Sequence, residues 1–197
     1  MSFDDLALVR RFLERGRLAV RLDAGHLVFW GLTLSLGLLL QYPAEVLDWV
    51  PSTILWIWQP LALLVWAGLV VAQTRGKPGW DPTVHACRAA FAAAGLVTAG
   101  SYIGALAGRI PDGYPSVLVA CAAATLAFVV TASLTQRLAA WTAAAGWLAL
   151  LIWFAWQGRL VPGDFIVLSL ACALFLAVPG LMLGRAPRLP PSGGIFA

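Results

Sequence analysis

The stretch LAAWTAAAGWLALLIWFAWQ, residues 138–157, contains no charged side chain and is long enough to cross a bilayer as one helix. Similar apolar stretches recur along the chain, which is 61% hydrophobic and only 11% charged. Soluble domains carry about a quarter charged residues. The sequence therefore predicts an integral membrane protein and excludes an ordinary soluble domain.

Polar residues, prolines and glycines divide the chain into six predicted membrane spans. They are residues 24–42, 53–73, 86–107, 115–135, 138–157 and 164–183. The connections between them are too short to hold a packed domain. The predicted fold class is all-α: a polytopic membrane helical bundle of six transmembrane helices over 24–183. An amphipathic interfacial helix is expected at 1–23, and a disordered cytoplasmic tail at 184–197.

The distribution of basic residues in the short connections predicts the orientation. If the N-terminus is cytoplasmic, 11 Lys and Arg residues lie inside and only Arg109 and Arg159 lie outside. Short cytoplasmic connections are enriched in Lys and Arg. Both termini are therefore expected in the cytoplasm, with the chain as a multi-pass protein of the plasma membrane.

The segment before the first span is basic and amphipathic, with Phe3, Leu6, Val9 and Leu13 at helical spacing. Five arginines lie between or opposite these apolar residues: Arg10, Arg11, Arg15, Arg17 and Arg21. Such a helix binds an anionic lipid surface and attracts an acidic partner. The arginines are thus the predicted contact for lipid or for a cytoplasmic regulatory protein. The alternative is that they only enforce the topology.

Gly100, Gly104 and Gly108 form two consecutive GxxxG steps in the third span. Small residues at this spacing allow two helix backbones to approach closely. We expect this face to contact another helix, either within the chain or in a homo-oligomer.

Gln59 and Pro60 suggest a solute site in the second span. Proline breaks a helical hydrogen bond, and Gln59 is the most polar side chain within any predicted span. Broken helices border substrate sites in transporters, although kinks are also common in ordinary membrane helices. A weak repeat between residues 89–127 and 139–177 fits the same transporter hypothesis.

No ionisable residue lies in the middle of a predicted span. Proton-coupled transport and intramembrane catalysis both need such a residue there, so the sequence predicts no catalytic site. Four carboxylates are expected in outer loops: Glu45, Asp48, Asp112 and Asp164. The three cysteines show no CxxC spacing and the two histidines lie at span ends, so neither a metal nor a cofactor is expected. Direct nucleic-acid binding is not expected either, because the charges form no run in a soluble domain.

The chain resembles a group of uncharacterised six-span bacterial membrane proteins of alphaproteobacterial type. The resemblance depends on these segments: DLALVRRFLERGR (5–17), GKPG (76–79), YIGA (102–105), GWLAL (146–150) and VPGLMLGR (178–185). It implies a bacterial inner membrane and no assigned reaction. In some members it implies pairing with a small winged-helix regulator. The element KPGWDPT (77–83) is similar to one in the tryptophan-rich sensory proteins, but it follows the wrong span for that family.

Two functions remain from the sequence. The first is a membrane scaffold or anchor for a cytoplasmic regulatory protein, which accounts for the basic segment and the lack of buried charge. The alternative is a small transporter or channel for an apolar or neutral solute.

Overall fold

The computed structural model describes residues 25–47, 60–70, 82–108 and 113–184. Every regular element in this part of the chain is helical. The elements are α2 (Gly25–Leu47), the helix Pro60–Val70, α4 (Pro82–Leu106), α5 (Tyr114–Thr135), α6 (Leu138–Gln157), α7 (Asp164–Cys172), the π-helix η1 (Ala173–Ala177) and α8 (Val178–Gly184). Elements α7, η1 and α8 form one continuous helix over 164–184. The all-α helical bundle predicted from the sequence is confirmed.

Five of these helices are long and apolar enough to cross a membrane: α2, α4, α5, α6 and the continuous helix Asp164–Gly184. The helix Pro60–Val70 is apolar but shorter. Large apolar side chains on the outside of the bundle, such as Trp156 and Leu126, are exposed in the isolated chain. An exposed apolar surface of this kind fits contact with lipid, so the bundle supports a multi-pass membrane protein.

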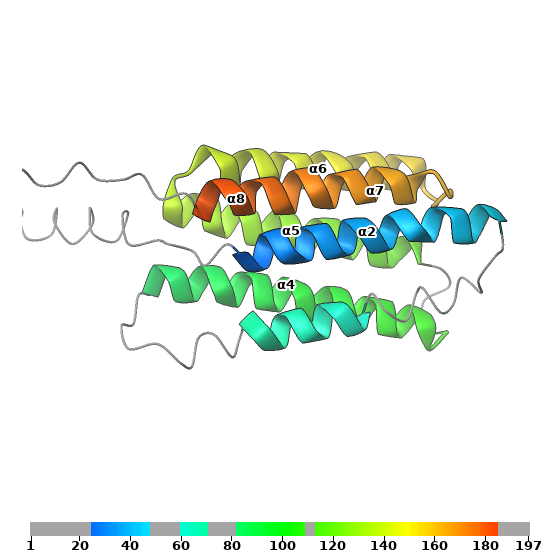
Figure 1. Ribbon diagram of the computed structural model, residues 1–197, viewed down its shortest axis with the longest axis horizontal. Helices are drawn as coiled ribbons and strands as arrows, with labels where there is room; N and C mark the ends of the chain where they lie inside the picture. The colour runs from blue at the N-terminus through cyan, green and yellow to red at the C-terminus, as the bar shows by residue number, and fades with distance from the viewer. Residues whose placement is uncertain (1–24, 48–59, 71–81, 109–112, 185–197) are drawn as a thin grey trace, which may run out of the picture.

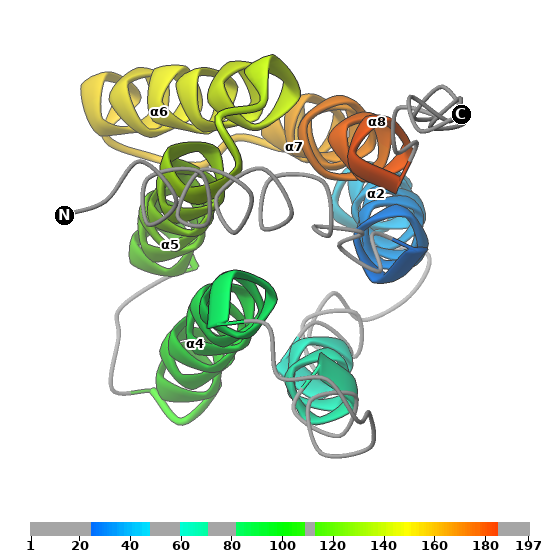
Figure 2. The same cartoon turned by 90° about the vertical axis from the view of Figure 1, so that its left-hand side faces the viewer.

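Viewed along their axes, the helices form a ring that follows the order of the chain (Figure 2). Helix α2 is followed around the ring by Pro60–Val70, α4, α5, α6 and the last helix, which packs back against α2. Neighbouring helices run in opposite directions (Figure 1). One end of the bundle therefore holds Gly25, Thr135 and Gly184, and the other holds Leu47, Tyr114 and Asp164. The second end is the one that the sequence places outside.

Helix α2 is longer than the sequence predicts. The first span was expected to end at residue 42, but α2 continues through Pro43 to Leu47. Proline lacks the amide hydrogen of one helical bond and yet is accommodated here. The Gln41 side-chain amide donates to Glu45 Oε1 at 2.8 Å, one turn along the helix. Glu45 is therefore helical, and its assignment to a loop is wrong.

Asp164 is likewise not a loop residue, because it begins α7 and is buried. Its Oδ2 accepts hydrogen bonds from Gln157 Nε2 at 2.9 Å and from the Val161 backbone at 2.8 Å. These bonds fix the short connection between α6 and α7, because a buried carboxylate requires hydrogen-bond donors. The other two predicted loop carboxylates, Asp48 and Asp112, lie outside the described residues.

Candidate ligand cavity

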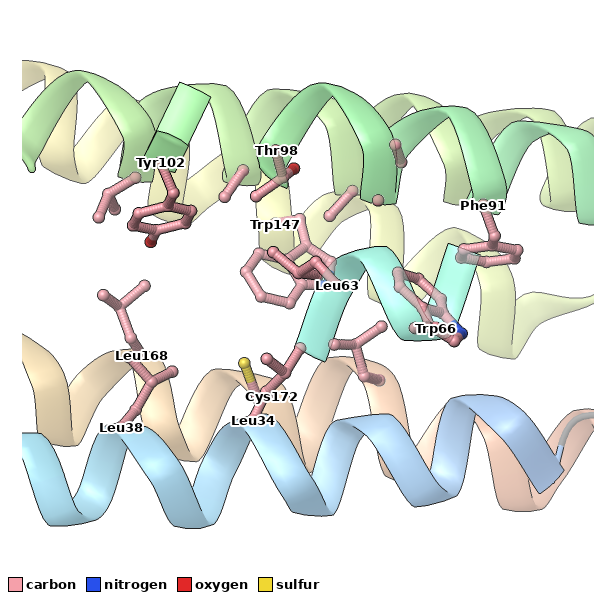
Figure 3. Close-up of a pocket in the computed structure, with 16 residues that line it drawn as sticks. Leu34, Leu38, Leu63, Trp66, Phe91, Thr98, Tyr102, Trp147, Leu168 and Cys172 are labelled. Atoms are coloured by element: carbon pink, nitrogen blue, oxygen red, sulfur yellow. The ribbon is translucent and has the colours of Figure 1, made fainter. Parts of the chain in front are cut away.

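A cavity lies inside the ring of helices. Its volume is about 90 Å³, several times the about 10–15 Å³ that one water molecule requires. Side chains from α2, Pro60–Val70, α4, α5, α6 and the last helix all line it (Figure 3). The cavity therefore belongs to the bundle as a whole.

The lining is almost entirely apolar. Leucines from α2 and α7 lie opposite aromatic rings that come from α4, α6 and the helix Pro60–Val70 (Figure 3). The lining residues that carry a polar side-chain atom are Thr98, Tyr102, Cys172, Trp66 and Trp147. No lining side chain carries a charge. Apolar cavities of this size exclude water and accept apolar ligands.

The residues that line the cavity extend along the helices. Along α4 it is lined by Phe91, Gly95, Thr98 and Tyr102, which share one helical face. At a rise of about 1.5 Å per residue, the 11 steps from Phe91 to Tyr102 separate these two residues by about 16 Å along the helix axis. The lining thus extends along the helix axes, and we call this cavity the slot.

Aromatic residues cluster at the end of the slot that lies toward Gly25. The ring centroids of Trp66 and Phe91 are 6.2 Å apart, and Trp66 lies 6.3 Å from Trp30 and 6.4 Å from His26. Gly95 makes room for this cluster, since a Cβ there would lie 3.1 Å from the Trp66 ring. Trp66 Nε1 is buried without a hydrogen bond in the described part of the chain, and Figure 3 shows it on the side away from the slot.

The last helix forms one wall of the slot at the point where it changes to π geometry. Cys172 and Leu176 line the cavity from this region. The Trp147 indole donates a hydrogen bond of 3.3 Å to the carbonyl of Phe175, a residue of the π segment. π segments within α-helices often lie at functional sites. This one sets the position of two lining residues.

Buried polar residues also lie toward the end of the bundle that holds Leu47, Tyr114 and Asp164. Gln41, Ser116 and Asp164 are all buried there. Gln41 Oε1 and Ser116 Oγ have no hydrogen-bond partner in the described structure. Buried polar atoms without a partner are uncommon and require an explanation.

The three glycines predicted as a packing face in the third span differ in their surroundings. Gly100 is exposed, and a Cβ added to it would meet no atom within 4 Å. Gly108 follows α4 in a turn, and its φ of +68° is a conformation that favours glycine. Gly104 is half-buried. Contact of this face with a second copy of the chain stays a prediction.

Close helix packing uses other glycines. A Cβ at Gly31 would lie 2.6 Å from the Ala177 nitrogen, and one at Gly180 would lie 2.9 Å from Leu27 Cβ. One at Gly146 would lie 2.5 Å from the Phe175 ring. These glycines join α2 and α6 to the last helix. Gly31 and Gly146 have no GxxxG spacing that would identify them, whereas Gly180 forms one with Gly184.

Of the two residues proposed as a solute site, Pro60 is buried at the start of its helix, and Gln59 lies outside the described residues. The five arginines of the basic segment lie outside them as well. Within residues 25–47, 60–70, 82–108 and 113–184, no three His, Cys, Asp or Glu side chains gather as metal ligands. Sequence reasoning missed Thr98 and Tyr102, whose place in the cavity lining depends on which helices become neighbours.

No protein-family model matches this chain, and comparisons with curated proteins and with solved structures give no match either. The cavity and its lining are therefore the features from which a function is argued.

Proposed function

We propose that this chain binds a small uncharged, apolar molecule inside its membrane bundle, as a carrier or transporter of that molecule. The cavity carries the proposal, because it is apolar, larger than a water site and lined from every side of the ring. This is the second of the two functions that the sequence left open. The scaffold hypothesis depends on the arginines of residues 1–23, and a regulatory partner for them stays a prediction.

The chemistry of the lining favours binding over catalysis. Leucine and aromatic side chains stabilise an apolar ligand through burial of its surface, by about 25 cal/mol for each Å². A charged solute would lose its hydration without gaining an ion pair, because no lining side chain is charged. The ligand is therefore neutral in the apolar part of the cavity.

The test is to fill the cavity and look for loss of the ligand. Ala120→Phe places a ring in the slot from α5, whereas Ala145→Phe places the same ring on the exposed side of α6. Native mass spectrometry of protein extracted with its membrane lipids should show a bound small molecule for the wild type and for Ala145→Phe. Ala120→Phe should lose it. Retention of the same molecule by both variants would show that binding does not use the cavity.

We also propose six spans with both termini in the cytoplasm of a bacterial inner membrane, the helix Pro60–Val70 being part of the second span, 53–73. The described basic residues support this orientation. Arg88 and Arg137 lie at the end of the bundle assigned to the inside, and Arg137 donates to the last-helix carbonyl of Leu183 at 3.1 Å. Reporter fusions after Gly79 and Gly113 should report inside and outside respectively. The opposite pattern would reverse the topology.

A further inference from the structure

Pro179 lies in the last helix at a position where an α-helix requires an amide hydrogen. In an α-helix the amide of residue 179 would donate to the carbonyl of Phe175, four positions earlier. Proline has no amide hydrogen, and its ring clashes with that same carbonyl in regular α geometry. The helix nevertheless continues through Pro179 to Gly184. The Phe175 carbonyl therefore has no α-helical donor.

The last helix changes to π geometry directly before this proline. The π segment covers Ala173–Ala177, and the Val178 amide donates to the Ala173 carbonyl, five residues earlier. A π turn contains one more residue than an α turn, which gives the carbonyls before a proline room to tilt away from its ring. Pro179 thus accounts for the position of the π segment.

Trp147 of α6 supplies the donor that Pro179 lacks. Its indole Nε1 donates to the Phe175 carbonyl at 3.3 Å. The Trp147 and Phe175 rings also pack edge to face, with their centroids 6.5 Å apart. Gly146 leaves the space that the Phe175 ring occupies, since a Cβ at Gly146 would lie 2.5 Å from that ring. Together these contacts hold the Trp147 indole in one orientation.

The same indole forms part of the slot. Trp147 is buried and lines the cavity, and Figure 3 shows its ring facing the middle of the slot. Helix α6 also carries Trp141, Trp153 and Trp156, which are exposed. The orientation of the Trp147 ring therefore sets part of the space that a ligand can occupy.

We propose that Pro179 is a positioning residue for the ligand site, which leaves the Phe175 carbonyl to the Trp147 indole and thereby limits the size of molecule that the slot accepts. The inference rests on the proposed function and adds the residues that determine its selectivity. The cavity volume of about 90 Å³ is smaller than the about 150 Å³ of an engineered apolar cavity that binds benzene or xenon. We expect the wild type to favour xenon, the smaller of these two probes.

The experiment measures the ratio of benzene affinity to xenon affinity. The full chain is purified in detergent with fluorotryptophan in place of tryptophan. Each probe is titrated while the fluorine NMR resonance of Trp66 is followed, because Trp66 lines the slot in every variant compared. Trp66→Phe assigns this resonance. Partition of the probes into detergent is the same for all variants, so it cancels when their ratios are compared.

Pro179→Ala restores the amide hydrogen that can donate to the Phe175 carbonyl. This amide competes with the Trp147 indole, which frees the ring to turn away from the slot, so the benzene-to-xenon ratio should rise. The expected rise is between about twofold and tenfold, which corresponds to the net contribution of one hydrogen bond. Trp147→Phe should raise the ratio by itself, and Pro179→Ala added to it should give no further rise.

Pro43→Ala is the matched control, because Pro43 also lies inside a helix but in α2 and outside the cavity lining. It should leave the ratio unchanged, and a rise equal to that of Pro179→Ala would overturn the assignment to Pro179. Pro179→Val restores the same amide with a side chain close in size to proline. It repeats the test if Pro179→Ala does not fold.

The outcomes separate this inference from the proposed function. An unchanged ratio in Pro179→Ala would overturn the inference and leave the slot as the binding site. An equal effect of Pro179→Ala with and without Trp147→Phe would show that Pro179 does not act through Trp147, which would also overturn it. Binding of neither probe, or binding that persists in Ala120→Phe, would overturn the proposed function as well.

Discussion

The contact between α2 and the π segment can be tested by adding one methyl group. In Gly31→Ala, the new Cβ would lie 2.6 Å from the Ala177 nitrogen, 2.9 Å from the Cys172 oxygen and 3.0 Å from Ala177 Cα. All three are backbone atoms, so no side-chain rotation relieves the overlap and the two helices must separate.

The expected magnitude follows from two opposing terms. Overpacking a well-packed core typically costs about 1–3 kcal/mol. We expect a cost of about 2–3 kcal/mol here, because backbone atoms cannot move aside as side chains can. Replacing a helical glycine by alanine gains about 0.8–1.0 kcal/mol. Gly31→Ala should therefore destabilise the protein by about 1–2 kcal/mol. Gly100 has open space around it, so Gly100→Ala should stabilise the protein by the helix-propensity gain alone.

Thermal unfolding in detergent measures the difference. A change of 1 kcal/mol moves the Tm of a chain of 150–250 residues by about 2–4 °C. Gly31→Ala should melt about 2–8 °C below the wild type, and Gly100→Ala about 2–4 °C above it. If Gly31→Ala melts at or above the wild-type Tm, the close approach of α2 to the π segment is wrong. A lower Tm for Gly100→Ala would instead show that a second chain packs on that face.

Three further substitutions test individual contacts. Asp164→Asn should lower the free energy of unfolding by about 1–3 kcal/mol in a denaturant titration, because the carboxylate that accepts hydrogen bonds from Gln157 and the Val161 backbone loses its charge. An unchanged free energy would mean that the α6–α7 connection does not depend on this charge. Ser35→Ala and Ser169→Ala should show a coupling of about 0.6 kcal/mol in a double-mutant cycle, because their hydroxyls lie 3.0 Å apart across α2 and α7; zero coupling would refute the bond. Trp147→Phe should cost about 1 kcal/mol and shift the tryptophan emission spectrum, since the indole donates to a π-segment carbonyl; a variant as stable as the wild type would show that this carbonyl needs no donor.

The helices could be predicted from hydropathy, because the residues of each span determine by themselves whether it is apolar enough to cross a membrane. Helix α6 covers Leu138–Gln157, and its ends coincide with Arg137 and with Gly158, whose φ of +72° ends the helix. The end of α2 could not be read in this way. Gln41, Pro43 and Glu45 look like a loop in isolation, and they become helical because Gln41 is buried and bonds to Glu45.

The contacts between helices could not be predicted, because they depend on which helices become neighbours. A GxxxG spacing marks Gly100 as a packing residue, yet its surroundings are open. Gly31 and Gly146 carry no such spacing, and the helix opposite each of them determines their role. The same limit applies to the cavity, whose lining includes single faces of helices far apart in the sequence.

The ring is closed by its first and last described helices, and this has a consequence for how the protein is made. Ser35 and Ser169, which join α2 to α7, are separated by 134 residues. At a synthesis rate of about 5–20 residues per second, the ribosome needs about 7–27 s to reach the second serine after the first. During that interval the serine and the glycine surface of α2 face lipid or the insertion machinery. A nascent chain halted before residue 164 therefore lacks the helix that closes the ring against α2.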